Sequence, residues 1–360
     1  MPKMDIDDTP IFKLEELEAH LQELVKSSDV LIDTKLFDAV ELQLTESNIS
    51  PLIPKLLPTI TQILLSTQQD PTVLASLSVK LLQPITFPQA LELASEDALI
   101  LALRSPVPAA NILAITIIEK ATKNPTHVAL LSNMKGVVEN YIRTWLSNPD
   151  VGVGERATRA LGGLLAADSD RRSSSITNGV GSMDIDAQHP PGQGLLWRRM
   201  FQDRDIYDTI FSLCSLKTVG TDNDQLDGKQ KTLAQARLLR LLPRLAALDC
   251  RTITRTFLPE VDNNYISPVG KPGLLYFAAM EMVDKEDLLM HMTLTIFFLE
   301  LLDAISTTDI AGSTKKYVAD MLKIAMESDV ELRQSVENIT VSPDSTPNLI
   351  ALVHSLNRES

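Results

Sequence analysis

The sequence predicts an all-α protein, a right-handed superhelical solenoid of stacked helical hairpins. Leucine is its commonest residue and aromatic residues make up only 4% of the chain, as expected for many amphipathic helices packed on each other. A length of 360 residues exceeds what one compact core usually holds, which favours several domains or an elongated stack. Residues 270–305 favour the stack, because they predict a hairpin whose second helix is apolar on nearly every side and needs several neighbours.

The N-terminal segment predicts two helical hairpins after a disordered N-terminus at residues 1–10. Apolar residues recur at spacings of three and four over the first helix, which is the pattern of a helix with one buried face. Asp70 followed by Pro71 is a strong start signal for the fourth helix, because the acid can cap free N–H groups and proline suits the first turn. The four helices are expected at 11–25, 31–44, 51–64 and 71–82.

The next stretch is broken by prolines and then becomes strongly apolar. Prolines divide residues 84–108 into short helices, of which 91–103 is the best defined. The apolar run 109–121 fits a buried strand or a buried helix, and its length favours the helix. An amphipathic helix is expected at 133–146. Residues 147–165 combine a turn with closely spaced small residues, a pattern similar to the second helix of a HEAT or armadillo repeat.

These patterns predict the domain organisation. Residues 11–167 are expected to form N-terminal helical repeats. Residues 168–194 lack aromatic residues and periodicity, which predicts a disordered insertion loop. A domain boundary is the alternative, but similar helices resume afterwards, so residues 195–336 are expected to continue the same solenoid, followed at 337–360 by a loop and a weak terminal helix. The helices expected in this half lie at 206–216, 231–248, 272–282, 284–305 and 314–326.

The hairpin at 270–305 has its own start signals. Pro272 is expected in the first turn of the first helix, where its missing N–H is not needed. Asp284 is expected to cap the second helix, with Glu286 and Asp287 in the first turn, where the helix dipole favours negative charge.

No catalytic or cofactor-binding pattern is present in the sequence. The phosphate-binding loop, the dinucleotide fingerprint, the G-x-S-x-G elbow and the H-E-x-x-H zinc motif are all missing. The five histidines are scattered, and Cys214 and Cys250 lie in leucine-rich helical segments that predict buried, inert thiols. We therefore expect a protein that is not an enzyme and that needs neither cofactor nor metal.

Charge and hydropathy narrow the classes of partner. A net charge of −14 argues against nucleic acid, because phosphate contacts need a basic surface. The acidic N-terminus does not resemble a signal peptide, and no run of 18 uncharged apolar residues predicts a membrane span. These features predict an intracellular, monomeric protein that binds other proteins and no membrane.

The candidate partner-binding residues lie on the predicted second helices of the hairpins. Arg237, Arg240 and Arg244 share one helix face, and they either cover apolar surface and pair with acids of the neighbouring repeat or form a partner-binding patch. His291 is expected to pair with Asp287 one turn away, with a pH switch or a partner contact as the alternative. The full set of candidates is Arg156, Arg159, Arg237, Arg240, Arg244, Asp287, His291 and Glu300, with Glu155 beside them.

Residues 273–302, GLLYFAAMEMVDKEDLLMHMTLTIFFLELL, resemble a known family. They are similar to the fungal branch of the proteasome base-assembly chaperones, HEAT/armadillo-type relatives of 26S proteasome non-ATPase regulatory subunit five, some of which are labelled mismatch-repair proteins. The resemblance implies that the chain binds the C-terminal helical domain of one AAA ATPase subunit, without a cofactor, during assembly of the regulatory-particle base in the cytoplasm and also in the nucleus. A helical-repeat adaptor or scaffold for nuclear transport or a DNA-repair complex is the alternative.

Overall fold

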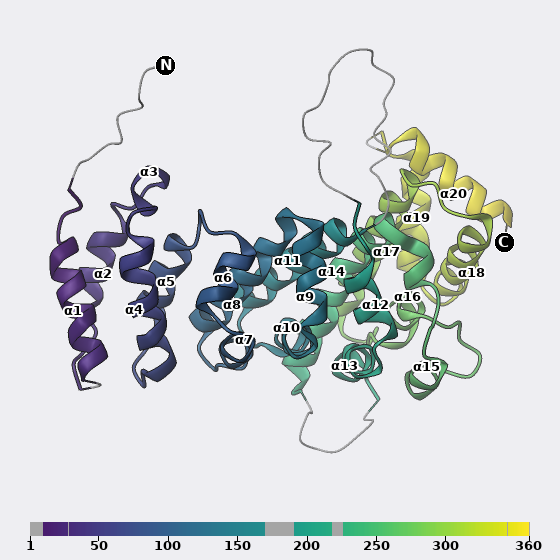
Figure 1. Cartoon of the computed structure of the whole chain (residues 1–360). Coiled ribbons are helices and arrows are strands. Elements are labelled where there is room, and N and C mark those ends of the chain that lie inside the picture. Colours follow the sequence, from purple (N-terminus) through teal and green to yellow (C-terminus); the bar gives the residue numbers. More distant parts are fainter. Residues whose placement is uncertain (1–9, 28, 170–190, 218–225, 344, 360) are drawn as a thin grey trace, which may run out of the picture. The chain divides into compact units, whose positions relative to one another are not determined.

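The computed structural model describes residues 10–27, 29–169, 191–217, 226–343 and 345–359. Every regular element among these residues is helical, and the helices pack as successive hairpins (Figure 1). The predicted all-α fold of stacked helices is thereby confirmed. The helices form two compact units, residues 1–141 and 142–360, and α10 (Lys135–Ser147) contains the boundary between them.

Unit 1 stacks helices in two rows. In one row α1 packs on α4, and in the other α2 packs on α5 and α5 on α8, while α4–α5 and α7–α8 form hairpins. Leucine and isoleucine side chains between the rows make the core. The elements are α1 (Leu14–Lys26), α2 (Thr34–Glu41), α3 (Glu46–Ile49), α4 (Ile53–Ser66), α5 (Thr72–Leu81), α6 (Phe87–Leu93), α7 (Glu96–Leu103), α8 (Pro108–Glu119), the 3₁₀ turn η1 (Lys120–Lys123) and α9 (Pro125–Asn133).

Local signals explain where several of these helices begin. Asp70 accepts hydrogen bonds from the backbone N–H and the hydroxyl of Thr72, at 3.0 and 2.6 Å. The helix α5 begins at Thr72 with Pro71 in the N-cap position, one residue later than the sequence predicted. The run 109–121 is mostly the helix α8, which excludes the strand alternative. A single helix at 91–103 is wrong: the chain breaks at Ala94, and Ser95 caps α7 by accepting a hydrogen bond from the N–H of Ala98 at 3.3 Å.

Unit 2 is built around three adjacent long helices. The central one, α14, packs against α11 on one side and α17 on the other, and α17 in turn packs against α19 and α20 (Figure 1). The elements after α10 are α11 (Val151–Asp168), α12 (Leu195–Gln202), α13 (Arg204–Cys214), α14 (Gly228–Ile253), α15 (Pro259–Tyr265), α16 (Leu274–Tyr276), the π-helical turn η3 (Phe277–Glu281), α17 (Leu288–Ser306), α18 (Gly312–Ser328), α19 (Val330–Val341) and α20 (Pro347–Glu359).

The hairpin at 270–305 differs from its prediction at both helix starts. Pro272 lies outside the helix, because Gly273 follows it with a φ of 102° and only then does α16 begin. Asp284 is not the cap of the second helix. It accepts a hydrogen bond from the N–H of Glu286 in a turn, and Asp287 caps α17 through the N–H groups of Leu289 and Met290. Capping by Asp287 satisfies two of the free donors at that terminus.

The predicted disordered segments 1–10 and 168–194 lie almost wholly outside the described residues. Where the second segment begins and ends, Asp168 is buried and its carboxylate accepts hydrogen bonds from the N–H groups of Leu196 and Trp197, at 2.7 and 3.1 Å. The last 24 residues hold more helix than expected, since α19 runs to Val341 and α20 follows. The other predicted domain limits stay predictions.

By length and composition, α17 is the one described helix that could cross a membrane. The same test is passed by core helices of proteins without a membrane span. The helix α17 packs against α14, α19 and α20, which bury one face of it in the core of unit 2.

Candidate partner-binding surface

The three adjacent helices α11, α14 and α17 carry the candidate residues, except Asp287, which caps α17 (Figure 1). Their close packing depends on small residues of α11. The side chain of Arg237 fills the space where a Cβ on Gly154 would lie, and that of Arg244 lies over Gly162 in the same way. The small residues that the sequence shows at 147–165 therefore do let a neighbour approach closely, and the neighbour's arginines use that room.

Arg237 is buried, with 5% of its surface exposed. Its Nη1 donates hydrogen bonds to the carbonyls of Trp145 and Leu146, at 3.0 and 3.1 Å, and its Nη2 donates to the carbonyl of Asp150 at 3.0 Å. Burial lowers the pKa of this guanidinium, against the attraction of Glu155 and Asp150. Arg237 thus joins α14 to the turn between α10 and α11, and its guanidinium donates its hydrogen bonds within unit 2.

The other arginines of this group are more accessible. Arg240, one turn after Arg237, forms an ion pair with Glu155 of α11, so this arginine is paired with an acid of the neighbouring helix. Arg159 and Arg244 are exposed, each one turn beyond a member of that pair, so they share its face. Arg156 is half-buried beside them. The exposed surface of α11 and α14 is consequently basic in a chain whose net charge is −14.

The exposed face of α17 is apolar over its first half and acidic beyond it. Leu289, Met292 and Ile296 are spaced by three and four and are all exposed, and Glu300 follows one turn later, also exposed. The sequence predicted that neighbours would cover this helix on more than one face, so the exposed apolar stripe was not expected. The signal was present in the run 288–302, which contains more apolar residues than one buried helix face needs.

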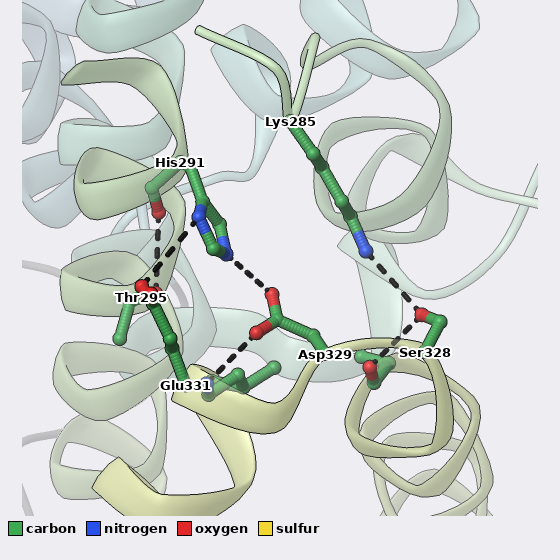
Figure 2. A network of polar contacts seen from close by, with 8 residues as sticks. Lys285, His291, Thr295, Ser328, Asp329 and Glu331 are labelled. Carbon is green, nitrogen blue, oxygen red and sulfur yellow. Dashed lines mark hydrogen bonds and ion pairs between the residues drawn. The ribbon is translucent and has the colours of Figure 1, made fainter. Parts of the chain in front are cut away.

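His291 does not form the predicted pair with Asp287, whose carboxylate caps α17. Its Nε2 lies 2.7 Å from a carboxylate oxygen of Asp329, at the corner between α18 and α19, and its Nδ1 lies 3.8 Å from Glu331 (Figure 2). The local prediction failed because the corner brings an acid closer than the same helix does. His291 therefore ties α17 to the last helices of unit 2.

Asp329 is an acceptor for two elements at once. Burial alone would raise its pKa, but the N–H of Leu332, which donates to it at 2.9 Å, and His291 together hold the pKa below its ordinary value. Nearby, Lys285 donates to the hydroxyl of Ser328 at 3.5 Å (Figure 2). This network holds the N-terminal part of α17 against α18 and α19. All of its residues belong to unit 2.

The structure contains few groups suited to catalysis within its described part. Among those residues no set of three His, Cys, Asp or Glu side chains could hold a metal ion. Cys214 and Cys250 are both buried, as expected, and burial raises the pKa of the Cys214 thiol well above its ordinary value. A raised pKa leaves that thiol protonated and poorly nucleophilic.

Residues 12–139 match the family model described as "DNA mismatch repair protein HSM3, N terminal domain". Residues 12–139 are therefore similar to the N-terminal domain of that family. This match confirms the resemblance to the base-assembly chaperones, and it does so through a part of the chain other than residues 273–302. No curated protein matches the chain at a significant level. The matched segment covers most of unit 1, whereas the candidate residues of α11, α14 and α17 lie beyond it.

Proposed function

We propose that the chain is a non-catalytic assembly chaperone that binds the C-terminal helical domain of one AAA ATPase subunit of the proteasome regulatory-particle base. The observation that supports the proposal is the match of residues 12–139 to the family described as DNA mismatch repair protein HSM3, which agrees with the resemblance of residues 273–302 to the base-assembly chaperones, some of which carry that label. An intracellular location, in the cytoplasm and the nucleus, belongs to the same proposal.

The surface of α11, α14 and α17 suits such a partner. A helical domain offers both apolar and charged side chains, and this surface offers the exposed apolar residues of α17 beside the exposed Arg159, Arg240 and Arg244. Complementary charge would set the orientation and the rate of association, and the apolar stripe would supply buried area. No reacting group is needed for this role.

Capture of purified ATPase domains tests the proposal directly. The full chain, immobilised, is expected to retain the isolated C-terminal domain of one base ATPase at moderate salt and to let the other ATPase domains pass. Failure to retain any of the base ATPase domains would overturn the proposal. Mass spectrometry of proteins that co-purify with the chain from cells gives an independent measurement.

A scaffold for a DNA-repair complex is the second candidate, favoured by the printed description of the family as a mismatch repair protein. A nuclear-transport adaptor is a related possibility for a helical-repeat chain. Repair or transport factors in the co-purification, without any proteasome subunit, would favour these roles over the chaperone.

A further inference from the structure

Unit 1 contains an apolar groove that the proposed function does not use. It lies between the α4–α5 hairpin and the α7–α8 hairpin and has a volume of about 550 Å³. The two hairpins pack through α5 and α8, but no comparable packing joins α4 to α7, so they diverge on that side. We refer to this feature as the α4–α8 groove. It belongs to the segment that matches the HSM3 domain, and it is separate from α11, α14 and α17.

The groove is open to solvent and its walls are apolar. Leu65 of α4 and Leu101 of α7 are 57% and 62% exposed at its sides. Ala98 and Ala102 of α7, and Ala110 and Ala114 of α8, supply small side chains one turn apart, which leaves the space that larger residues would fill. Exposed leucines beside an unfilled apolar groove are typical of a surface that binds another protein.

The dimensions of the groove fit a short helix. The lining residues of α4 extend from Leu57 to Leu65, which corresponds to about 12 Å along the helix axis. Side chains at positions i, i+4 and i+7 of a bound helix cover about the same length, and apolar anchors at such positions are the usual means of binding a helix in a groove. A volume of about 550 Å³ accommodates a few large apolar side chains.

One residue determines the charge that the groove prefers. Arg104, which follows α7, is the only charged residue among those that line the groove. Its Nε donates a hydrogen bond to the Oδ1 of Asn140 at 2.6 Å, and the Nδ2 of buried Asn140 donates to the carbonyl of Gly136 at 2.7 Å. Asn140 thereby holds the arginine at the edge of the groove. A held guanidinium with its terminal nitrogens available suits a carboxylate.

We propose that the α4–α8 groove binds an amphipathic helix of a partner protein, with apolar side chains between the two hairpins and an acidic residue paired with Arg104. The site is independent of the ATPase-binding surface proposed above, because it lies in unit 1 and shares no residue with that surface. Apolar contact supplies the affinity, and Arg104 selects an acidic helix over a basic one.

The test uses the full chain and three fluorescent model peptides of equal length. One has leucines at positions i, i+4 and i+7 with flanking glutamates, the second has lysines in place of the glutamates, and the third has the acidic sequence scrambled. We expect the acidic amphipathic peptide to bind about tenfold more tightly than the lysine peptide in fluorescence anisotropy, and the scrambled peptide to bind more weakly than both. A photo-crosslinker at a central leucine should label the helices that line the groove, which are α4, α5, α6, α7 and α8.

Three variants sharpen the result. Arg104→Glu is expected to weaken the acidic peptide about tenfold and to strengthen the lysine peptide, a reversal that a merely structural effect would not produce. Leu101→Gln should weaken both amphipathic peptides. Leu42→Gln is the matched control, because Leu42 is 84% exposed in the same unit and does not line the groove.

Several outcomes would overturn the proposal. These are equal binding of the scrambled peptide, crosslinks confined to other helices, and no response to Arg104→Glu. Dimerisation that Leu101→Gln abolishes in sedimentation would identify a second copy of the chain as the occupant. Binding of a small anionic apolar dye without any peptide binding would identify a small-molecule site instead. Because ATPase capture is measured separately, either proposal can fail while the other holds.

Discussion

The guanidinium of Arg237 on α14 occupies the space in which a side chain on Gly154 of α11 would begin. From that position it donates hydrogen bonds to the carbonyls of Trp145, Leu146 and Asp150. One arginine therefore satisfies the carbonyls of a turn and also fills the gap between two adjacent helices. The spacing of α11 and α14, on which the candidate surface depends, requires both residues.

Gly154→Ala is expected to destabilise the protein by about 2–4 kcal/mol, because the added methyl group displaces a buried, hydrogen-bonded cation. Chemical denaturation followed by circular dichroism measures the change in the free energy of unfolding. Gly152→Ala on the same helix is the control, since Gly152 is exposed and a Cβ there meets only the side chain of Asp150. A loss of stability below about 0.5 kcal/mol in Gly154→Ala would contradict this role for Arg237.

Charge reversal of the exposed arginines separates binding from stability. Arg240→Glu combined with Arg244→Glu should weaken capture of the ATPase domain about tenfold or more and leave the melting temperature nearly unchanged, because exposed ion pairs contribute at most about 1 kcal/mol. Arg237→Ala, by contrast, should lower the melting temperature, because Arg237 is buried and hydrogen-bonded within unit 2. Undiminished capture by the double variant would show that these arginines are solvated and do not contribute to binding of the ATPase domain.

Local spacing predicted where helices lie better than where they begin, and contacts between residues distant in sequence were predicted only in part. The starts predicted at Asp70, Pro272 and Asp284 differ from the structure, but the apolar run 109–121 was interpreted correctly, because helix length depends on neighbours in sequence. The partner of His291 was not, since Asp329 is 38 residues away and reaches it only through the corner of α18 and α19. The α4–α8 groove was likewise invisible in the sequence, because it exists where two hairpins fail to pack.

Gly273 is a second position where a side chain is excluded. Its φ of 102° is strained for other residues, and a Cβ there would lie 2.8 Å from the carbonyl carbon of Thr254. Its N–H also donates to the carboxylate of buried Asp262 at 2.7 Å. Gly273→Ala should therefore lower the free energy of unfolding by about 2–4 kcal/mol in a urea titration.

Gly228→Ala provides the comparison for Gly273→Ala. Gly228 opens α14, and a Cβ there would meet no atom within 4 Å. Alanine favours helix, so this variant is expected to be neutral or slightly stabilising. An equal loss of the free energy of unfolding in Gly273→Ala and Gly228→Ala would mean that the strained backbone at Gly273 does not cause the destabilisation.

The contact between His291 and Asp329 predicts how stability depends on pH. The pKa of Asp329 lies below its ordinary value in the folded chain, because the bonds from Leu332 and His291 outweigh the effect of burial. A depressed carboxyl pKa stabilises the fold above the unfolded-state pKa of about 3.9, and this contribution is lost as the pH falls through the folded-state pKa. Asp329→Asn keeps the helix cap for Leu332 but removes the charge. It should therefore be less stable than the natural chain at pH 7, by about 1–2 kcal/mol in urea titrations, with the difference shrinking below about pH 4. A difference that stays constant from pH 7 to about pH 3 would show that the charge of Asp329 does not contribute, and that only the packing of the corner holds α17 to α19.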